Sequence, residues 1–453
     1  MYYLDAVKTI GKIETEFDVM SVKCKGVSMW PLLRINLIDR LCERDVTMKD
    51  NGGKAIKIVV RTLFKHNPFS IFVRRRLWLF AGYERRKMVG NENILRISGA
   101  ITKVEPDTLV VEKPSHLQLS KEVGHIPEQH IISESWILLF VHLIMPFLKL
   151  KQLKIENEVV IKKALSDIDV KFDYQASIRL LLAQYYFMSF LMRLVSRPQK
   201  VIIECPYAVM GYVWAFHRKG ISVIEMQHGV LNSQHYAYCS NYHSKELYPD
   251  EIWCFGEDEY QYLTSDNCNY CPKVTKTGLY FLDVANEFFS NDVFADERKK
   301  YEKVVLVAGQ RGYEQVLATF VDEIAQSHPA QCFVYVPRTT EEVVKIKQPN
   351  VLYRPGINIY EYMKWCDLHL TISSTTAIEC QYFHKPTIFY DYENLGRKYY
   401  GSVLSENNGI AFVNNTDEYE NADSLINNRE FSFKECFTPG TVGIIDELLN
   451  TEQ

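Results

Sequence analysis

The chain has 453 residues, which is too long for one ordinary hydrophobic core and fits two large domains. Hydrophobic residues make up 47% and charged residues 24%, the balance of a packed globular protein rather than a disordered one. The formal net charge of -4 provides no overall cationic field, so nucleic acid is not an expected partner.

The first residues, MYYLDAVKTIGKIETEF, carry acidic side chains and no apolar run, unlike a secretory signal. We therefore expect a cytoplasmic protein whose eleven cysteines are reduced and mostly buried. Cys268 and Cys271 have the spacing of a zinc knuckle, which would need further ligands from Cys239, Cys254, His235 or His243. Because no second pair of cysteines accompanies the first, we expect no metal site.

The longest apolar run covers residues 136–148 and contains Pro146. It is shorter than the roughly 20 residues that a membrane span needs. Lys149, Lys151 and Lys154 follow it directly. We expect a core helix with a solvated basic end. The alternative is peripheral association with the cytoplasmic face of the inner membrane, because apolar bulk beside basic residues binds anionic lipid.

Short apolar runs alternate with amphipathic stretches, a pattern typical of parallel sheets that are buried on both faces. In the first half we expect strands at 77–80, 108–111, 201–203 and 222–224. Helices are expected at 173–196, before Pro198, and at 207–218, before Gly220.

The polar stretch ANEFFSNDVFADERKKYEK after Asp283 separates the two halves. Beyond it we expect strands at 304–309, 332–337, 351–353, 368–373 and 386–391. The intervening helices are expected at 314–326, 340–346, 360–365 and 376–383. The pattern predicts an N-terminal domain with an extension over 1–284, a C-terminal domain over 300–435, and a tail over 436–453.

In open parallel sheets, ligands bind at the carboxyl ends of the strands. In the second half, the residues at or just beyond these ends are Gln310, Arg338, Ser373, Ser374, Thr375, Thr376 and, on the following helix, Glu379. Backbone amides, hydroxyls and a guanidinium together can bind a nucleotide phosphate without a metal ion. The structural alternatives are a helix cap for Ser374 or Thr375 and a surface ion pair for Arg338.

In the first half, His228 follows the strand at 222–224 and lies between Gln227 and Gly229, a glycine that permits a sharp turn. An imidazole at this place can take a proton from an acceptor hydroxyl or bind a phosphate, since its unperturbed pKa of about 6.5 suits both tasks. A satisfied, half-buried histidine is the structural alternative. Glu225 is a second candidate base or a structural partner.

Arg85 and Arg86 follow the strand at 77–80. Two guanidinium groups at a strand end can contact a charged acceptor or a donor phosphate. We therefore include both among the candidate site residues.

The strings VIEMQHGV, DEIWCFGEDEYQYL, TGLYFLD and DLHLTISSTTAIECQYFHKPTIFYD resemble bacterial capsule and lipopolysaccharide glycosyltransferases of the GT-B fold. Similar layouts occur in transferases that use CMP-sugars and, more distantly, in teichoic-acid polymerases that use CDP-glycerol. The resemblance implies an α/β protein with two Rossmann-like, doubly wound domains that face each other across a cleft. It also implies a nucleotide-sugar donor, with CMP or UDP favoured, a glycan or lipid-linked acceptor, and no further cofactor.

By the same resemblance, residues 373–376 would hold the donor's phosphate or sugar and Glu379 would orient the ribose or the loop. Gln310 and Arg338 would complete the donor pocket. These families often carry His-Pro after the second C-terminal strand, where this chain has Pro337 and Arg338. Three alternatives remain: a nucleotide-sugar 2-epimerase on the same architecture, a CDP-alditol-type phosphotransferase, and a non-catalytic scaffold that binds sugar nucleotides.

Overall fold

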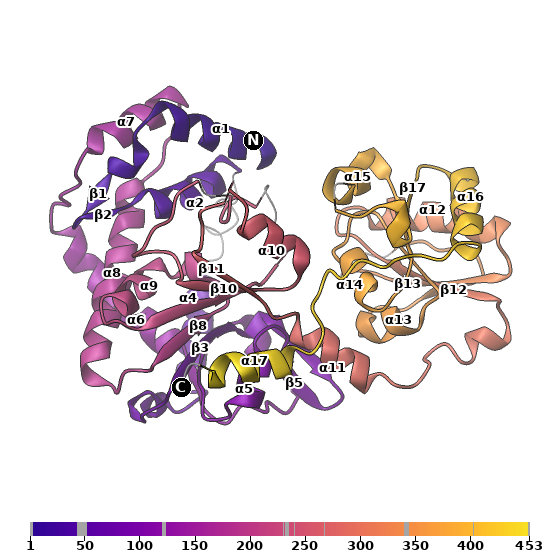
Figure 1. The fold of residues 1–453 in the computed structure, drawn as a ribbon, viewed down its shortest axis with the longest axis horizontal. Coiled ribbons are helices and arrows are strands. Elements are labelled where there is room, and N and C mark those ends of the chain that lie inside the picture. Colours follow the sequence, from indigo (N-terminus) through magenta and orange to yellow (C-terminus); the bar gives the residue numbers. More distant parts are fainter. Residues whose placement is uncertain are drawn as a thin grey trace. The chain divides into compact units, whose positions relative to one another are not determined.

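The computed structural model describes residues 3–42, 52–119, 124–229, 231, 235–239, 241–266, 268–338, 344–401 and 403–451. They form two compact units (Figure 1). Unit 1 comprises Met1–Phe255, Glu259–Tyr280 and Thr441–Gln453, and unit 2 comprises Gly256–Asp258 and Phe281–Gly440. Each unit is an α/β structure with its own parallel sheet, which confirms the prediction of an α/β protein with two parallel-sheet domains.

Unit 1 is built on a seven-stranded sheet in the order β11-β10-β9-β8-β3-β6-β7, and every neighbouring pair is parallel. Its strands are β3 (Leu77–Gly82), β6 (Leu109–Lys113), β7 (Ile131–Ser133), β8 (Lys200–Ile203), β9 (Ser222–Met226), β10 (Glu251–Cys254) and β11 (Lys273–Lys276). All six residues of β3 are buried, as a central strand covered on both faces requires. Two short antiparallel pairs, β1 (Lys23–Cys24) with β2 (Val27–Ser28) and β4 (Arg86–Val89) with β5 (Glu92–Leu95), lie outside this sheet.

The helices of unit 1 are α1 (Tyr3–Glu16), α2 (Trp30–Leu41), α4 (Gly52–Thr62), α5 (Gly99–Val104), α6 (Ser135–Lys149), α7 (Glu158–Asp167), α8 (Tyr174–Leu194), α9 (Met210–His217) and α17 (Thr441–Asn450). Helix α10 (Glu257–Leu263) belongs to unit 1 from Glu259 on. The carboxylate of Asp173 caps α8 by accepting a hydrogen bond from the amide of Ala176 at 2.9 Å. One core lies between the sheet and α6, α8 and α9, and a second joins α1, α2, α7 and α8.

Unit 2 contains a six-stranded sheet in the order β14-β13-β12-β15-β16-β17, again parallel throughout. The strands are β12 (Lys303–Ala308), β13 (Gln331–Val336), β14 (Val351–Tyr353), β15 (Leu368–Thr371), β16 (Thr387–Tyr390) and β17 (Ile410–Val413). The helices are α11 (Tyr280–Phe288, in unit 2 from Phe281 on), α12 (Glu314–Ser327), α13 (Ile359–Trp365), α14 (Thr376–Tyr382), α15 (Leu395–Tyr400) and α16 (Thr416–Asn427). Side chains of α12 and α16 share the core on one face of this sheet.

The expected strands of both halves form, each with its ends shifted by at most a few residues. The helix expected at 340–346 falls partly on residues 340–343, outside those that the structure describes, and residues 344–346 are in no helix. The stretch expected to be a tail contains α17, which lies beside α5 in unit 1 (Figure 1). A hydrogen bond from the Arg76 guanidinium to the carbonyl of Leu449 holds the end of α17.

The longest apolar run forms the single helix α6, with Pro146 inside it. Ile137 and Val141 are buried in the core, whereas Phe140, Leu143 and Phe147 are exposed. Only one side of this helix is therefore buried in the core, and the expectation of a core helix is met only in part. No helix within the described ranges is both long enough and apolar enough to span a bilayer.

Candidate functional site

The three predicted donor-binding segments of unit 2 follow adjacent strands. The sheet places β12 between β13 and β15, with Val307 opposite Tyr335 on one side and Leu370 on the other. Because all three strands are parallel, the residues that follow them meet at one edge of the sheet. Gln310, Arg338 and residues 373–376 thus come together at the carboxyl edge.

Glu314, the first residue of α12, fixes this edge. Its buried carboxylate accepts a hydrogen bond from the backbone amide of Arg338 at 2.7 Å and another from the hydroxyl of Tyr335 at 2.6 Å. A Cβ atom on Gly309 would lie 2.7 Å from Oε1 of Glu314 and 2.9 Å from the amide nitrogen of Arg338. Only glycine fits this close approach, and the guanidinium of Arg338 remains in solvent.

The serine and threonine residues at the edge differ in their contacts. The hydroxyl of Thr376 lies 3.1 Å from Nε2 of the buried His369, whose Nδ1 lies 3.2 Å from the Thr387 hydroxyl. Burial lowers the pKa of His369 to about 3, so its ring is neutral. The Ser374 hydroxyl accepts a hydrogen bond from the amide of Thr376 at 3.3 Å, which is close to the capping role that is its structural alternative.

Thr375 is the N-cap residue of α14, and its exposed side chain makes no capping hydrogen bond. Ser373 is half-buried, and its carbonyl accepts a hydrogen bond from Tyr400 at 3.2 Å. Glu379 lies inside the unit, where the hydroxyl of Tyr360 donates to it at 3.2 Å. Thr375 is therefore the best placed of these hydroxyls for a ligand, and Glu379 supports the loop from within.

In unit 1, the buried carboxylate of Glu225 on β9 is enclosed by tyrosines. Tyr238 donates to its Oε1 at 2.5 Å and Tyr270 donates to its Oε2 at 2.6 Å. Burial raises the pKa of Glu225 to about 8, against the opposing effect of these two hydrogen bonds and of Arg85. Glu225 is 0% exposed and both of its oxygens are engaged, so the geometry fits the structural alternative rather than a base that touches substrate.

His228 lies beside this carboxylate, with only 9% of its side chain exposed. Its Nε2 is 2.9 Å from the hydroxyl of Tyr207, and its Nδ1 is 3.5 Å from the hydroxyl of Tyr238 and 3.9 Å from Oε1 of Glu225. Burial, with Arg85 and His235 nearby, holds the pKa of His228 well below its usual range. The imidazole is therefore neutral at physiological pH, which is the form that a general base requires.

The two residues that flank His228 have different roles. Gln227 is buried and braces the loop, because its amide nitrogen donates to the carbonyl of Gly229 at 2.8 Å and to Glu259 at 3.0 Å. Its side-chain oxygen accepts from the amide of Phe255 at 2.7 Å. Gly229 is exposed, has no positive φ, and a Cβ atom there would meet nothing within 4 Å among the described residues. The backbone bends at Gly229, but neither its φ nor its described surroundings require glycine.

A cavity of about 160 Å³ opens at the carboxyl ends of β3, β6 and β8. Arg85, Lys113 and Glu204 are among the charged residues that line it. Glu204 accepts hydrogen bonds from the amide of Gly82 at 3.0 Å and from the Ser98 hydroxyl at 2.7 Å. Burial raises the pKa of Glu204 despite the opposing charge of Arg85, whose Nε lies 3.9 Å away.

Arg85 presents a donor that the described residues leave unsatisfied. Its Nη1 is buried and has no hydrogen-bond partner among them. An unpaired guanidinium nitrogen beside a cavity is suited to bind a phosphate, carboxylate or sugar oxygen. Nη2 of Arg86 is likewise buried without a partner among the described residues, but this side chain is only 1% exposed and pairs inside the unit with Glu112 at 2.7 Å and Glu128 at 2.8 Å. The geometry of Arg86 favours a structural role over the predicted contact with a substrate.

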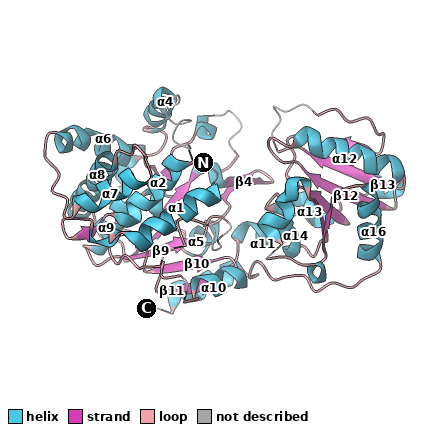
Figure 2. Cartoon of the chain, turned by 90° about the horizontal axis from the view of Figure 1, so that it is seen from above, coloured by secondary structure: helices cyan, strands magenta, loops and turns pink. Residues whose placement is uncertain are grey.

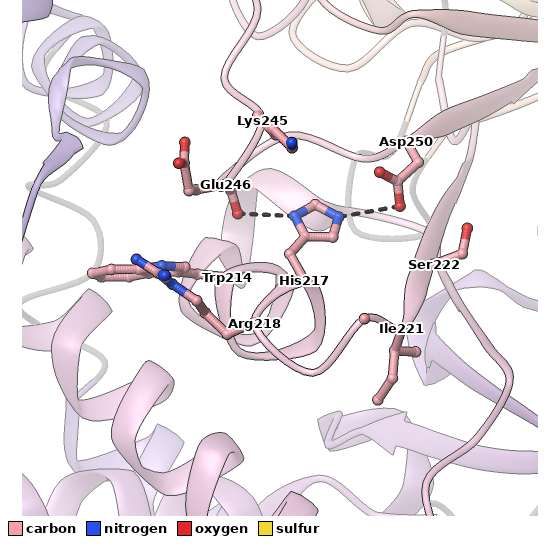
Figure 3. A pocket seen from close by; sticks show the side chains of 9 residues that line it. Trp214, His217, Arg218, Ile221, Ser222, Lys245, Glu246 and Asp250 are labelled. Carbon is pink, nitrogen blue, oxygen red and sulfur yellow. Dashed lines mark hydrogen bonds and ion pairs between the residues drawn. The ribbon is translucent and has the colours of Figure 1, made fainter.

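A larger pocket of about 540 Å³ lies at the opposite edge of the sheet, where β9 begins at Ser222 (Figure 3). The imidazole of His217 lines this pocket. Its Nδ1 lies 3.1 Å from the carbonyl of Glu246, and its Nε2 lies 3.2 Å from the carboxylate of Asp250. Asp250 also accepts from the amide of Val223 at 2.9 Å. These contacts join loops at the amino end of the strands, away from the edge where parallel sheets bind ligands.

The cysteine pair makes contacts with the backbone. The thiol of Cys268 donates to the carbonyl of Tyr238 at 3.3 Å, and that of Cys271 donates to the carbonyl of Pro249 at 3.4 Å. Across the residues that the structure describes, no group of three or more His, Cys, Asp or Glu side chains is arranged to hold a metal ion.

Sequence reasoning missed Glu204, Tyr207, Tyr238, Tyr270 and Glu314. Glu204 and Tyr207 follow β8 just as His228 follows β9, so the rule that ligands gather at strand ends could have found both. Tyr238 and Tyr270 come from loops that no local pattern connects with Glu225.

No protein-family model and no curated protein sequence matches the chain. Among solved structures, it is similar to the UDP-GlcNAc 2-epimerase from Methanocaldococcus jannaschii, with 13% identity, a TM-score of 0.46, and coverage of 83% of this chain and 99% of the other. The chain is also similar to the UDP-GlcNAc 2-epimerase from Neisseria meningitidis, solved with UDP-GlcNAc. That comparison gives 13% identity, a TM-score of 0.46, and coverage of 83% of this chain and 100% of the other.

The wall teichoic acid polymerase TagF gives 10% identity, a TM-score of 0.46, and coverage of 90% of this chain and 98% of the other. At this level of similarity, an assignment of function depends on the residues of the chain itself. By its own structure, the chain is a two-unit α/β protein with a parallel sheet in each unit.

Proposed function

We propose that the chain is a glycosyltransferase that moves a sugar from a nucleotide-sugar donor to a surface polysaccharide or lipid-linked glycan. The observation that carries this proposal is the carboxyl edge of unit 2. There Gln310, Arg338 and residues 373–376 follow three adjacent parallel strands, and Glu314 fixes the loop that bears Arg338. A parallel sheet with polar loops at this edge is the usual setting for nucleotide binding.

On the donor side, Arg338 and Thr375 supply a solvent-facing guanidinium and a hydroxyl without a capping bond. Together with backbone amides they can bind the phosphate of CMP or UDP and stabilise it as it leaves, without a metal ion. Gln310, half-buried on the neighbouring loop, completes the pocket in this proposal. Glu314 and Glu379 position these loops and do not touch the donor.

On the acceptor side, the proposal assigns Arg85 to a charged or hydroxylated group of the acceptor and His228 to proton removal. The bond between the anomeric carbon and the donor phosphate breaks, and a bond from the acceptor oxygen to that carbon forms. The acceptor proton passes through the Tyr207 hydroxyl to Nε2 of His228, 2.9 Å away. Glu225 acts only through Tyr238, which it holds beside the imidazole.

The first alternative, a 2-epimerase, needs no acceptor. Incubation of the purified protein with UDP-GlcNAc alone separates the two functions, and the proposal predicts that no epimer forms. Accumulation of the epimer without an acceptor would overturn the transferase assignment.

The direct test is nucleotide release from CMP-, CDP-, UDP- and GDP-sugars in the presence of isolated capsule or lipid-linked glycan. The proposal predicts release that depends on the acceptor and is lost in His228→Ala. Transfer of an alditol phosphate from a CDP-alditol would instead support the phosphotransferase alternative. Nucleotide binding with no turnover on any acceptor would support the scaffold.

A further inference from the structure

Acidic residues are absent from three segments of unit 1. Residues 52–83, 135–155 and 174–203 contain no aspartate or glutamate, although they hold seven, three and four lysines and arginines. The whole chain has a net charge of -4, so these segments concentrate positive charge in an otherwise acidic protein. The first segment covers α4, the turn after it and β3, the second covers α6 with the loop after it, and the third covers α8 with β8. In the first segment, Arg75 and Arg76 pair with Asp107 and Glu105, which leaves its other five cations as the source of positive charge.

The helices of these segments lie against one another. The hydroxyl of Thr62 on α4 is 2.7 Å from that of Ser135 on α6, and the Trp136 indole donates to the carbonyl of Leu63 at 2.7 Å. Helix α6 in turn packs on α8, where Phe140 stacks on Phe187 with ring centroids 5.1 Å apart. Figure 2 shows α4 and α6 along one edge of unit 1, with α8 beside α6.

Large apolar side chains of this region extend into solvent. Phe64 after α4 is 80% exposed, Phe147 on α6 is 68% exposed, and Leu150 just beyond α6 is 85% exposed. Lys149, Lys151 and Lys154 are exposed in the same stretch of chain as Phe147 and Leu150. We call these residues the basic apolar face. Soluble surfaces seldom expose such side chains together unless another surface covers them.

We propose that the basic apolar face docks unit 1 on the surface of a bilayer that contains anionic phospholipid. Exposed phenylalanine and leucine side chains can enter the boundary between headgroups and acyl chains, and lysine and arginine are attracted to anionic headgroups. The three segments themselves contain no carboxylate that would repel anionic headgroups. A second copy of the same face fits less well, because it would bring like charges together. The proposal concerns the surface of unit 1 and does not depend on the transferase assignment.

Co-sedimentation of the full chain with lipid vesicles tests the proposal. We expect binding to vesicles of phosphatidylcholine mixed with phosphatidylglycerol, weaker binding to phosphatidylcholine alone, and release as ionic strength rises. The triple variant Lys149→Glu, Lys151→Glu, Lys154→Glu should weaken binding by about tenfold or more. The double variant Phe147→Ser, Leu150→Ser should weaken it by a similar factor.

Two exposed positions of unit 2 provide matched controls, since Leu425 is 67% exposed and the Lys299 side chain is 73% exposed. Leu425→Ser and Lys299→Glu should leave vesicle binding within about twofold of wild type. Failure of the wild-type chain to bind anionic vesicles would overturn the proposal. Binding as tight as that of wild type by the triple lysine variant and the Phe147→Ser, Leu150→Ser variant would overturn it as well. The face would instead belong to an interface with a second copy if the wild-type chain self-associated without binding vesicles and the double variant Phe147→Ser, Leu150→Ser abolished that self-association. Tighter binding to an oligonucleotide than to anionic vesicles would also contradict the proposal.

Discussion

The carboxylate of Glu314 accepts a hydrogen bond from the backbone amide of Arg338 at 2.7 Å. This bond ties the first turn of α12 to the loop after β13, at the edge of the sheet where a nucleotide is expected. Because the bond uses the backbone of Arg338, it does not engage the guanidinium, which is exposed. The fold of the loop and the chemistry of the site can therefore be changed separately.

Arg338→Ala should weaken nucleotide binding by about tenfold and leave the thermal stability of unit 2 unchanged, since charge-assisted hydrogen bonds contribute roughly 1.5–3 kcal/mol. Isothermal titration with the nucleotide that binds best measures this loss. Lys345→Ala, at an exposed lysine of the same unit, is the control and should bind like wild type. Equal affinity in Arg338→Ala and wild type would remove Arg338 from the donor site.

Gly309→Ala should destabilise the protein by about 1–3 kcal/mol, because the new Cβ must displace the Glu314 carboxylate or the loop that bears Arg338. Denaturant unfolding monitored by circular dichroism measures the change. Gly443 lies inside α17, where a Cβ atom would meet nothing within 4 Å, so Gly443→Ala should be neutral or stabilising. A stable Gly309→Ala variant would contradict the close approach of Gly309 to Glu314.

His228→Ala and Tyr207→Phe should each lower turnover by about 10²- to 10⁴-fold, because both interrupt the path of the acceptor proton. Nucleotide affinity should not change in either variant. His116→Ala, at an exposed histidine of unit 1, controls for loss of an imidazole elsewhere. If turnover by His228→Ala stayed within a few-fold of wild type, His228 would be a structural residue.

Glu225 makes stability depend on pH. Its pKa is about 8 in the folded chain, against an ordinary value of 4.5, so the folded state holds the proton more tightly than the unfolded state. This contribution is fully present below about pH 4.5 and is lost as pH rises through about 8. Glu225→Gln should therefore flatten the fall in unfolding free energy between about pH 5 and 8.

The test is to measure the free energy of unfolding between about pH 5 and 8 for wild type, Glu225→Gln and the control Glu420→Gln. Glu420 is exposed, and its substitution should keep the wild-type slope. A wild-type slope in Glu225→Gln as well would show that Glu225 is not the group responsible.

The alternation of apolar runs and helices in the sequence predicted β3, β6, β8 and β9 of the first sheet and β12 to β16 of the second. It missed β10, although this inner strand is fully buried, and the short edge strand β7. It did not reveal the edge strand β11, because the residues KVTK offer no apolar run and are only partly buried. Strand β17 was missed as well. It is an edge strand of the sheet in unit 2, and its two middle residues are only half-buried.

Strand-end reasoning from the sequence selected His228 and Arg85, and the structure places both at the carboxyl edge of one sheet, after the strands that flank β8. It could not separate Arg85 from Arg86, because adjacent residues can point to opposite sides of the backbone. The tyrosines around Glu225 were not predicted either. They meet it through loops whose path depends on packing in the second core of unit 1.

The thermal shift of wild type and Arg338→Ala with CMP, CDP, UDP and GDP tests most directly whether unit 2 holds a nucleotide. A ligand that binds only the folded state raises the melting temperature, whatever the acceptor is. We predict that CMP or UDP stabilises the wild-type chain and that the shift is smaller in Arg338→Ala. If none of the four nucleotides raised the melting temperature at millimolar concentration, the nucleotide site and the transferase assignment would both be contradicted.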